Sequence, residues 1–106
     1  MTNDASSTDA DSPPEIHVVD APEEKRFEIR VGDELAGFVT YARHPDRIVF
    51  IHTEIFDKWE GHGLGSTLAR AVLDEARAAG LRVVPRCPFI ASYIKGHVEF
   101  ADLVDA

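Results

Sequence analysis

The residues best suited to bind a ligand lie in a glycine-rich stretch, residues 59–66, with the sequence Trp-Glu-Gly-His-Gly-Leu-Gly-Ser. It follows an apolar run that ends near Ile55 and precedes an amphipathic segment that reaches Ala79. A glycine-rich turn between a strand and a helix leaves backbone N–H groups free at the helix N-terminus, where the helix dipole also favours negative charge. We therefore predict that a pyrophosphate-bearing ligand is held by the backbone of Gly61, His62, Gly63, Leu64, Gly65 and Ser66.

Two common phosphate-binding motifs do not fit this stretch. Its glycines do not have the G-x-G-x-x-G spacing of a dinucleotide-binding loop, and the strands expected ahead of it are antiparallel. A Walker loop requires a lysine and then a serine or threonine after its last glycine, whereas here Ser66 and Thr67 follow Gly65. The predicted loop therefore binds phosphate without a lysine.

Composition limits the possible partners. The formal net charge of −8 argues against nucleic acid, whose backbone requires a basic surface. An acidic surface suits a cationic partner such as an amine, although many soluble proteins are acidic. The single cysteine, Cys87, excludes an internal disulfide.

The chain length fits one domain preceded by a tail. Residues 1–14 contain three Asp and no Lys or Arg, so we predict a disordered acidic tail and a folded domain over residues 15–106. The start lacks the features of a signal peptide, and no segment is long enough to span a membrane, so we expect a cytoplasmic protein without membrane contact.

The hydrophobic pattern predicts a mixed α+β fold. Strands are expected over residues 16–19, 26–31, 34–43 and 47–55, with an antiparallel hairpin turn at Gly32 and Asp33. The apolar run over residues 47–55 has no polar face, which favours a strand covered on both sides. A helix over residues 64–79 and a strand over 81–84 form a right-handed crossover, so this strand should be parallel to the 47–55 strand. A second helix is expected over residues 89–97.

Residues 52–104 resemble the GNAT superfamily of acetyl-CoA-dependent N-acetyltransferases and, more narrowly, its minimal YjdJ-type branch. The glycine stretch carries the similarity together with Cys-Pro-Phe at residues 87–89, the helix centred on Tyr93, and the Ala-Asp-Leu-Val sequence at residues 101–104. The resemblance covers the chain except for the tail. It implies a compact sheet that splays near its middle, with acetyl-CoA lying in the opening.

The resemblance also implies how the donor is bound. Backbone N–H groups of the 47–55 strand, at Thr53, Glu54 and Ile55, would contact the thioester carbonyl. The superfamily loop has Arg or Gln where this chain has Glu60. Because a carboxylate beside a pyrophosphate is repulsive, we expect Glu60 to point away and backbone amides alone to hold the phosphates.

Amide formation requires removal of a proton from the amine, stabilisation of the carbonyl oxygen and protonation of the leaving thiolate. His52 shares strand parity with Ile48 and Phe50, so its ring should face a largely apolar side of the sheet. It is either a core or rim histidine or, as the resemblance implies, a general base or amine-orienting group.

Two further side chains have alternative interpretations. Cys87 is a small buried hydrophobe, a wall of the acetyl pocket, or an acyl-accepting nucleophile beside Arg86. The resemblance implies direct transfer of the acetyl group to the amine, which favours the pocket role. Tyr93 either protonates the thiolate, as the resemblance implies, or packs as a core aromatic. No ligand spacing supports a metal site among the histidines and Cys87.

The leading hypothesis is a minimal N-acetyltransferase that moves an acetyl group from acetyl-CoA directly to an unidentified small-molecule or protein amine. The alternative is a non-catalytic module that binds CoA or acyl-CoA. The short turn at Gly32 and Asp33 favours this alternative, because it leaves no room for the helices that usually build the acceptor pocket in the superfamily. A third possibility is an interaction protein that binds no CoA.

Overall fold

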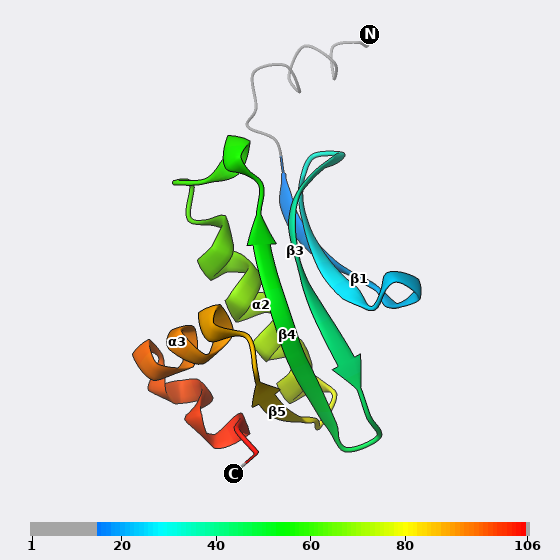
Figure 1. Ribbon diagram of the computed structural model, residues 1–106, viewed down its shortest axis with the longest axis vertical. Coiled ribbons are helices and arrows are strands. Elements are labelled where there is room, and N and C mark those ends of the chain that lie inside the picture. The colour runs from blue at the N-terminus through cyan, green and yellow to red at the C-terminus, as the bar shows by residue number, and fades with distance from the viewer. Residues whose placement is uncertain (1–14, 106) are drawn as a thin grey trace, which may run out of the picture.

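The computed structural model describes residues 15–105, in which a five-stranded sheet packs with helices (Figure 1). The tail predicted over residues 1–14 lies outside the described residues. The strands follow one another in the sheet as they do along the chain: β1 (Ile16–Ala21), β2 (Arg26–Val31), β3 (Glu34–Arg43), β4 (Arg47–Ile55) and β5 (Arg82–Pro85). Strands β1 to β4 are antiparallel neighbours, and β5 is parallel to β4. The predicted mixed α+β layout is confirmed.

The helical elements are α2 (Leu64–Ala78) and α3 (Pro88–Gly96), with short 3₁₀ turns at η1 (Pro22–Glu24), η2 (Asp57–Trp59) and η3 (Val98–Leu103). Helix α2 forms because apolar residues four apart make one buried stripe of Leu64, Leu68, Val72 and Ala76. Its end is closed by hydrogen bonds from the N–H of Gly80 to the Arg77 carbonyl and from the N–H of Leu81 to the Ala76 carbonyl. None of the helices in the described part of the chain is long and apolar enough to cross a membrane.

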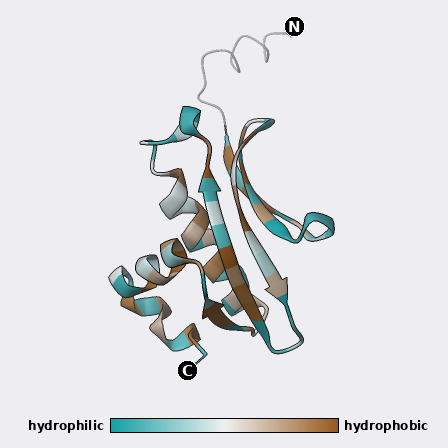
Figure 2. Cartoon of the chain, in the orientation of Figure 1, coloured by the Kyte–Doolittle hydropathy of each residue, from teal (hydrophilic) through white to brown (hydrophobic). Residues whose placement is uncertain are grey.

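The hydrophobic core lies on one face of the sheet, the covered face. Helix α2 packs against β2 to β5, and Figure 1 shows it behind β4. Phe50 of β4 is fully buried on this face, whereas the next residue, Ile51, is 48% exposed on the other, open face. The prediction that β4 is covered on both sides is therefore wrong. The apolar run covers only the first half of β4, and Figure 2 shows the change to polar residues in the second half.

The open face contains a buried carboxylate. Glu28 of β2 is 5% exposed, and its two oxygens accept hydrogen bonds from Arg26 and Arg30, which flank it on the same strand. Burial raises the pKa of Glu28, but the hydrogen bonds from the two guanidinium groups outweigh it, so the pKa lies below its usual range. The guanidinium of Arg26 also lies 4.7 Å from the ring centre of Phe38 on β3. Charged and aromatic side chains thus take the place that helices have on the covered face.

A β-bulge changes which residues of β4 face the core. Thr40 of β3 pairs with His52, but the next residue, Tyr41, pairs with Phe50, so Ile51 has no partner on β3. The extra residue reverses the alternation for the rest of the strand. As a result His52 lies on the open face and Thr53 on the covered face.

Candidate functional site

A hollow of about 270 Å³ lies over the N-terminus of α2. Its wall combines the glycine-rich stretch with one apolar side chain each from β4 and α3, and is lined by Ile55, Trp59, Glu60, Gly61, Gly63, Leu64, Gly65, Ser66 and Phe89. Most of the residues predicted to bind the ligand are therefore brought together here. His62 is exposed and instead meets the Trp59 ring edge-on, with ring centres 5.9 Å apart.

The local backbone explains why glycines occupy this turn. Gly61 and Gly63 have φ angles of 84° and 76°, a region that side chains disfavour. Gly63 caps α2 without a side-chain hydrogen bond, and Thr67 donates the first backbone hydrogen bond of the helix, to the Gly63 carbonyl. The N–H groups of the three residues before Thr67 therefore have no partner within the helix and are available to an anion.

Gly65 is required for a different reason. A Cβ atom built there would lie 2.9 Å from the tip of the Phe89 ring, so the ring packs directly against the helix backbone. Phe89 is 41% exposed and belongs to the first turn of α3. This close approach closes the hollow on the α3 side with an apolar ring.

Strands β4 and β5 separate just below the hollow. Their pairing ends at Phe50 and Pro85, and the N–H of Cys87 then donates to the Phe50 carbonyl over 2.9 Å. Strand β4 continues to Ile55 without β5 beside it, while its other edge remains paired with β3. The predicted splay is thus present. It leaves one backbone edge of residues 51–55 open toward the hollow. Successive N–H groups of a strand point to opposite edges, and the N–H of Phe56 donates to the Ala36 carbonyl beside β3, so the open edge carries the N–H groups of Thr53 and Ile55, whereas that of Glu54 faces β3.

Cys87 lies where the two strands part. It is 2% exposed, and its Sγ is 3.2 Å from the hydroxyl oxygen of Thr53. The bulge in β4 makes this contact possible, because it turns Thr53 to the covered face. Sequence reasoning assigned Thr53 only a backbone role and missed its side chain.

His52 is placed differently from the prediction. Its side chain is 61% exposed on the open face rather than turned to an apolar side, because the bulge intervenes between Phe50 and His52. Its Nε2 lies 3.4 Å from a carboxylate oxygen of Glu54, two residues along the strand. His52 and Cys87 therefore lie on opposite faces of the sheet, one on each side of the open edge of β4.

Tyr93 is buried between α3 and η3. Its ring stacks on His97 at 3.8 Å between ring centres and lies 6.2 Å from the ring centre of Phe100. His97 is fixed there because its Nδ1 donates to the Tyr93 carbonyl. Arg70 of α2 is a further neighbour, and its pKa is raised first by the hydrogen bond to Glu99 and also by Tyr93. These contacts tie Tyr93 to α2 and η3.

Two further expectations concern charge. Glu60, which we expected to point away from the loop, is exposed and forms part of the wall of the hollow. Within residues 15–105 no group of three or more His, Cys, Asp or Glu side chains is placed to hold a metal ion. The site thus consists of a glycine-rich backbone and apolar walls, with the acidic residue Glu60 among the residues that line it.

Comparison with known proteins gives the family. Residues 26–103 match the model of the GCN5-related N-acetyl-transferase family, and the chain belongs to this family. A search of curated proteins finds no match.

Solved structures agree with this assignment. The chain is similar to a GCN5-like protein from Staphylococcus aureus determined by NMR, with 25% identity, a TM-score of 0.63, and coverage of 85% of this chain and 88% of that one. Its fold is also similar to that of a ribosomal-protein-alanine N-acetyltransferase from Brucella melitensis biovar Abortus 2308, with 19% identity, a TM-score of 0.54, and coverage of 76% and 61%. The predicted superfamily and fold are confirmed, and the chain is an acetyltransferase domain of the GNAT type. The YjdJ-type branch stays a prediction.

Proposed function

We propose that the protein is an acetyl-CoA-dependent N-acetyltransferase that passes the acetyl group directly to an amine. The observation that carries this proposal is the continuity between the hollow over α2 and the open edge of β4. Ile55 belongs to both, so one elongated ligand would contact the free amides of α2 at one end and the strand backbone at the other.

Three parts of acetyl-CoA have a suitable surface in this arrangement. The pyrophosphate would bind backbone N–H groups of residues 61–66, among them the three free ones at the start of α2, and the helix dipole would assist this binding. The pantetheine arm would pass between the apolar side chains of Ile55 and Phe89. The thioester would then lie along β4, where the N–H group of Thr53 or Ile55 on the open edge would donate to its carbonyl oxygen. Donors of this kind stabilise a developing oxyanion by about 3–4 kcal/mol.

The amine would approach from the open face. His52 is exposed there beside Glu54, so its imidazole is available to orient the amine or take its proton. The amine nitrogen attacks the thioester carbonyl, the C–S bond breaks, and the CoA thiolate leaves and takes up a proton. Tyr93 stays a prediction as the donor of that proton. The acceptor is proposed only as an amine, on a small molecule or a protein.

Cys87 has a supporting role in this scheme. Its thiol is buried against Thr53, which suits a wall of the acetyl pocket rather than an acyl-accepting nucleophile. Mass spectrometry after incubation with acetyl-CoA alone checks this role. We expect no stable acetyl adduct on Cys87, and an adduct that a subsequently added amine removes would overturn direct transfer.

The activity is tested by following free thiol release from acetyl-CoA with a panel of amines. We expect His52→Ala to lower kcat/KM by about 10²-fold, the lower end of the range for a general base. His44→Ala, at an exposed turn outside the site, is the matched control and should leave the rate unchanged. Equal rates for the parent protein and for His52→Ala would remove His52 from the mechanism.

One observation favours the alternative, a non-catalytic module that binds CoA or acyl-CoA. His52, Cys87 and Tyr93 lie in three different surroundings: the open face, the covered face, and the contact between α3 and η3. The same thiol assay separates the two functions. Binding of acetyl-CoA without thiol release for any amine would support the module and contradict the enzyme.

A further inference from the structure

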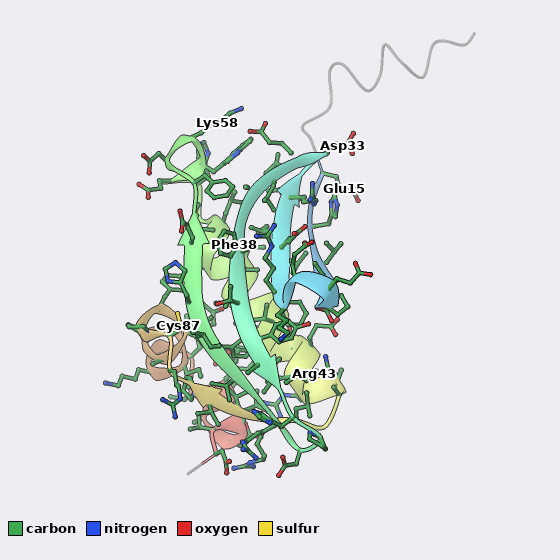
Figure 3. The ribbon with its side chains drawn as sticks, turned by 45° about the vertical axis from the view of Figure 1, so that its right-hand side comes forward. Glu15, Asp33, Phe38, Arg43, Lys58 and Cys87 are labelled. Atoms are coloured by element: carbon green, nitrogen blue, oxygen red, sulfur yellow. The ribbon has the colours of Figure 1, made fainter. Side chains whose placement is uncertain are left out.

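A single carboxylate connects the β2–β3 hairpin to the wall of the hollow. Both oxygens of Glu34, the first residue of β3, lie 3.0 Å from Nζ of Lys58, and one also accepts a hydrogen bond of 3.3 Å from the indole N–H of Trp59. The hydrogen bond from Lys58 is the main reason that the pKa of Glu34 lies below its usual range. In Figure 3 Lys58 and the hairpin residue Asp33 lie at the same end of the molecule.

The segment that Glu34 contacts is only lightly anchored, because of its side chains only that of Trp59 packs, partly buried, against the hydrophobic core. Turn η2 has no side-chain cap and no buried residue. Among residues 15–105, all the side-chain hydrogen bonds that η2 makes are donated by Lys58 or Trp59 to Glu34. The other hydrogen bonds of η2 are backbone ones, such as that from the N–H of Trp59 to the Phe56 carbonyl. A segment with few buried contacts and few cross-links opens readily.

Lys58, Trp59 and His62 behave as one unit attached to Glu34. The ammonium of Lys58 lies 5.2 Å from the centre of the Trp59 ring, so it covers the ring while it binds the carboxylate. The Trp59 ring in turn meets His62 of the glycine-rich stretch. Loss of the carboxylate would remove the hydrogen bond of the indole and the anchor of Lys58, and would leave only partial core packing to hold the Trp59 ring against the loop.

We propose that Glu34 is a positioning residue of the donor site, which fixes the Trp59 indole as a wall of the hollow and thereby sets the affinity for acetyl-CoA. This inference rests on the proposed function. Glu34 lies in the hairpin, far from the glycine-rich stretch in sequence, yet it would take part in binding the donor. The expected signature is a change in KM for acetyl-CoA with an unchanged kcat, because Glu34 contacts neither the thioester edge of β4 nor His52.

The test uses Trp59, the only tryptophan of the chain, as a reporter. Acetyl-CoA is titrated into the parent protein and into Glu34→Gln, with binding followed by calorimetry and by Trp59 emission. Glu99→Gln is the matched control, because Glu99 makes a similarly exposed ion pair with Arg70 at 2.9 Å without lining the hollow. We expect about fivefold weaker binding for Glu34→Gln and less than a twofold change for Glu99→Gln.

Ligand-free measurements separate positioning from a general loss of folding. Acrylamide should quench Trp59 emission more strongly in Glu34→Gln than in the parent protein, while the two circular dichroism spectra coincide. Lys58→Gln keeps the hydrogen bond from Trp59 and should give a smaller loss of affinity than Glu34→Gln. If Glu34→Gln does not fold, Lys58→Gln carries the test through acrylamide quenching of Trp59, which should exceed that of the parent protein because Lys58 covers the ring. Unchanged quenching in this variant would overturn the positioning role.

The outcomes distinguish this inference from the proposed function. If the parent protein binds acetyl-CoA and Glu34→Gln binds equally well, the positioning role is overturned and the proposed function stands. If the parent protein binds no acetyl-CoA, both are overturned. An equal loss of affinity in Glu34→Gln and Glu99→Gln would also overturn it, since the loss would then not depend on the contact with Trp59.

Discussion

The two faces of the sheet differ in how they are built. On the covered face, α2 and the apolar side chains of β2 to β5 form the core, and the hollow at the top of α2 is lined mainly by backbone and apolar groups. Between β2 and β3 there is no helix that could cover the open face, because a two-residue turn joins the two strands directly. Exposed Ile51, His52 and Glu54 occupy that face of β4 instead.

If the proposed function holds, this difference determines which substrate the molecule selects more strictly. A donor bound through backbone amides needs glycines and a helix start, and these features are fixed by the chain itself. An acceptor on an open face would meet only a few exposed side chains and no enclosed pocket. We therefore expect narrow selection of the donor and broad selection of the acceptor amine.

The largest expected effect is a difference in stability between substitutions at two adjacent residues of β4, one on each face of the sheet. Phe50→Ala removes a fully buried ring and should lower the free energy of unfolding by about 3–5 kcal/mol. Ile51→Ala removes a half-exposed side chain and should cost less than about 1 kcal/mol. Urea denaturation of both variants measures the difference, and similar losses would show that the open face is covered in solution.

A second prediction concerns Tyr41, which lies where the covered face reaches β1. Burial and then the hydrogen bond of 2.6 Å to Asp20 raise its pKa from 10.0 to about 12. Because the folded protein holds this proton more tightly than the unfolded chain, its contribution to stability is complete below pH 10. That contribution, about 2–3 kcal/mol, is lost as the pH rises toward 12.

Denaturation at pH 8 and pH 11.5 checks this prediction for Tyr41. The parent protein should lose more stability between the two values than Tyr41→Phe, which has no phenolic proton. An equal loss in both proteins would mean that Tyr41 is exposed, and that the covered face ends before β1.

The smallest expected effect concerns the charge at the hollow. Glu60 adds a carboxylate to a wall that would face the phosphates, so Glu60→Gln should strengthen acetyl-CoA binding by about two- to fivefold. Calorimetry at low and at high salt measures it, and the gain should shrink at high salt. Weaker binding after this substitution would show that Glu60 stabilises the loop and does not repel the phosphates.

Much of the fold follows from local patterns in the sequence. Alternation over residues 26–31 and the apolar stripe of α2 predicted these elements almost to the residue, and the crossover rule predicted that β5 is parallel to β4. These features depend on periodicity, which the sequence displays directly. The glycine-rich stretch was also visible in the sequence, because its glycines lie between a predicted strand and a predicted helix.

Other parts of the site depend on a bulge that no residue type marks. The bulge in β4 lies at Ile51, and no glycine or proline marks it there. Simple alternation along the strand therefore placed His52 on the wrong face and left the Thr53–Cys87 contact unforeseen. The packing of Phe89 on Gly65 and the contacts of Glu34 with Lys58 and Trp59 join residues distant in sequence. Such contacts arise from tertiary structure, which patterning along the chain does not contain.

The central claim is that the hollow over α2 binds acetyl-CoA, and calorimetry with acetyl-CoA tests it most directly. The matched variant is Gly63→Glu, which places a charged side chain at a φ of 76° beside the free amides. We predict binding of one acetyl-CoA per chain by the parent protein and a loss of at least about 100-fold, or about 2.7 kcal/mol, in the variant. Absence of heat with the parent protein, or equal binding by the folded variant, would contradict it.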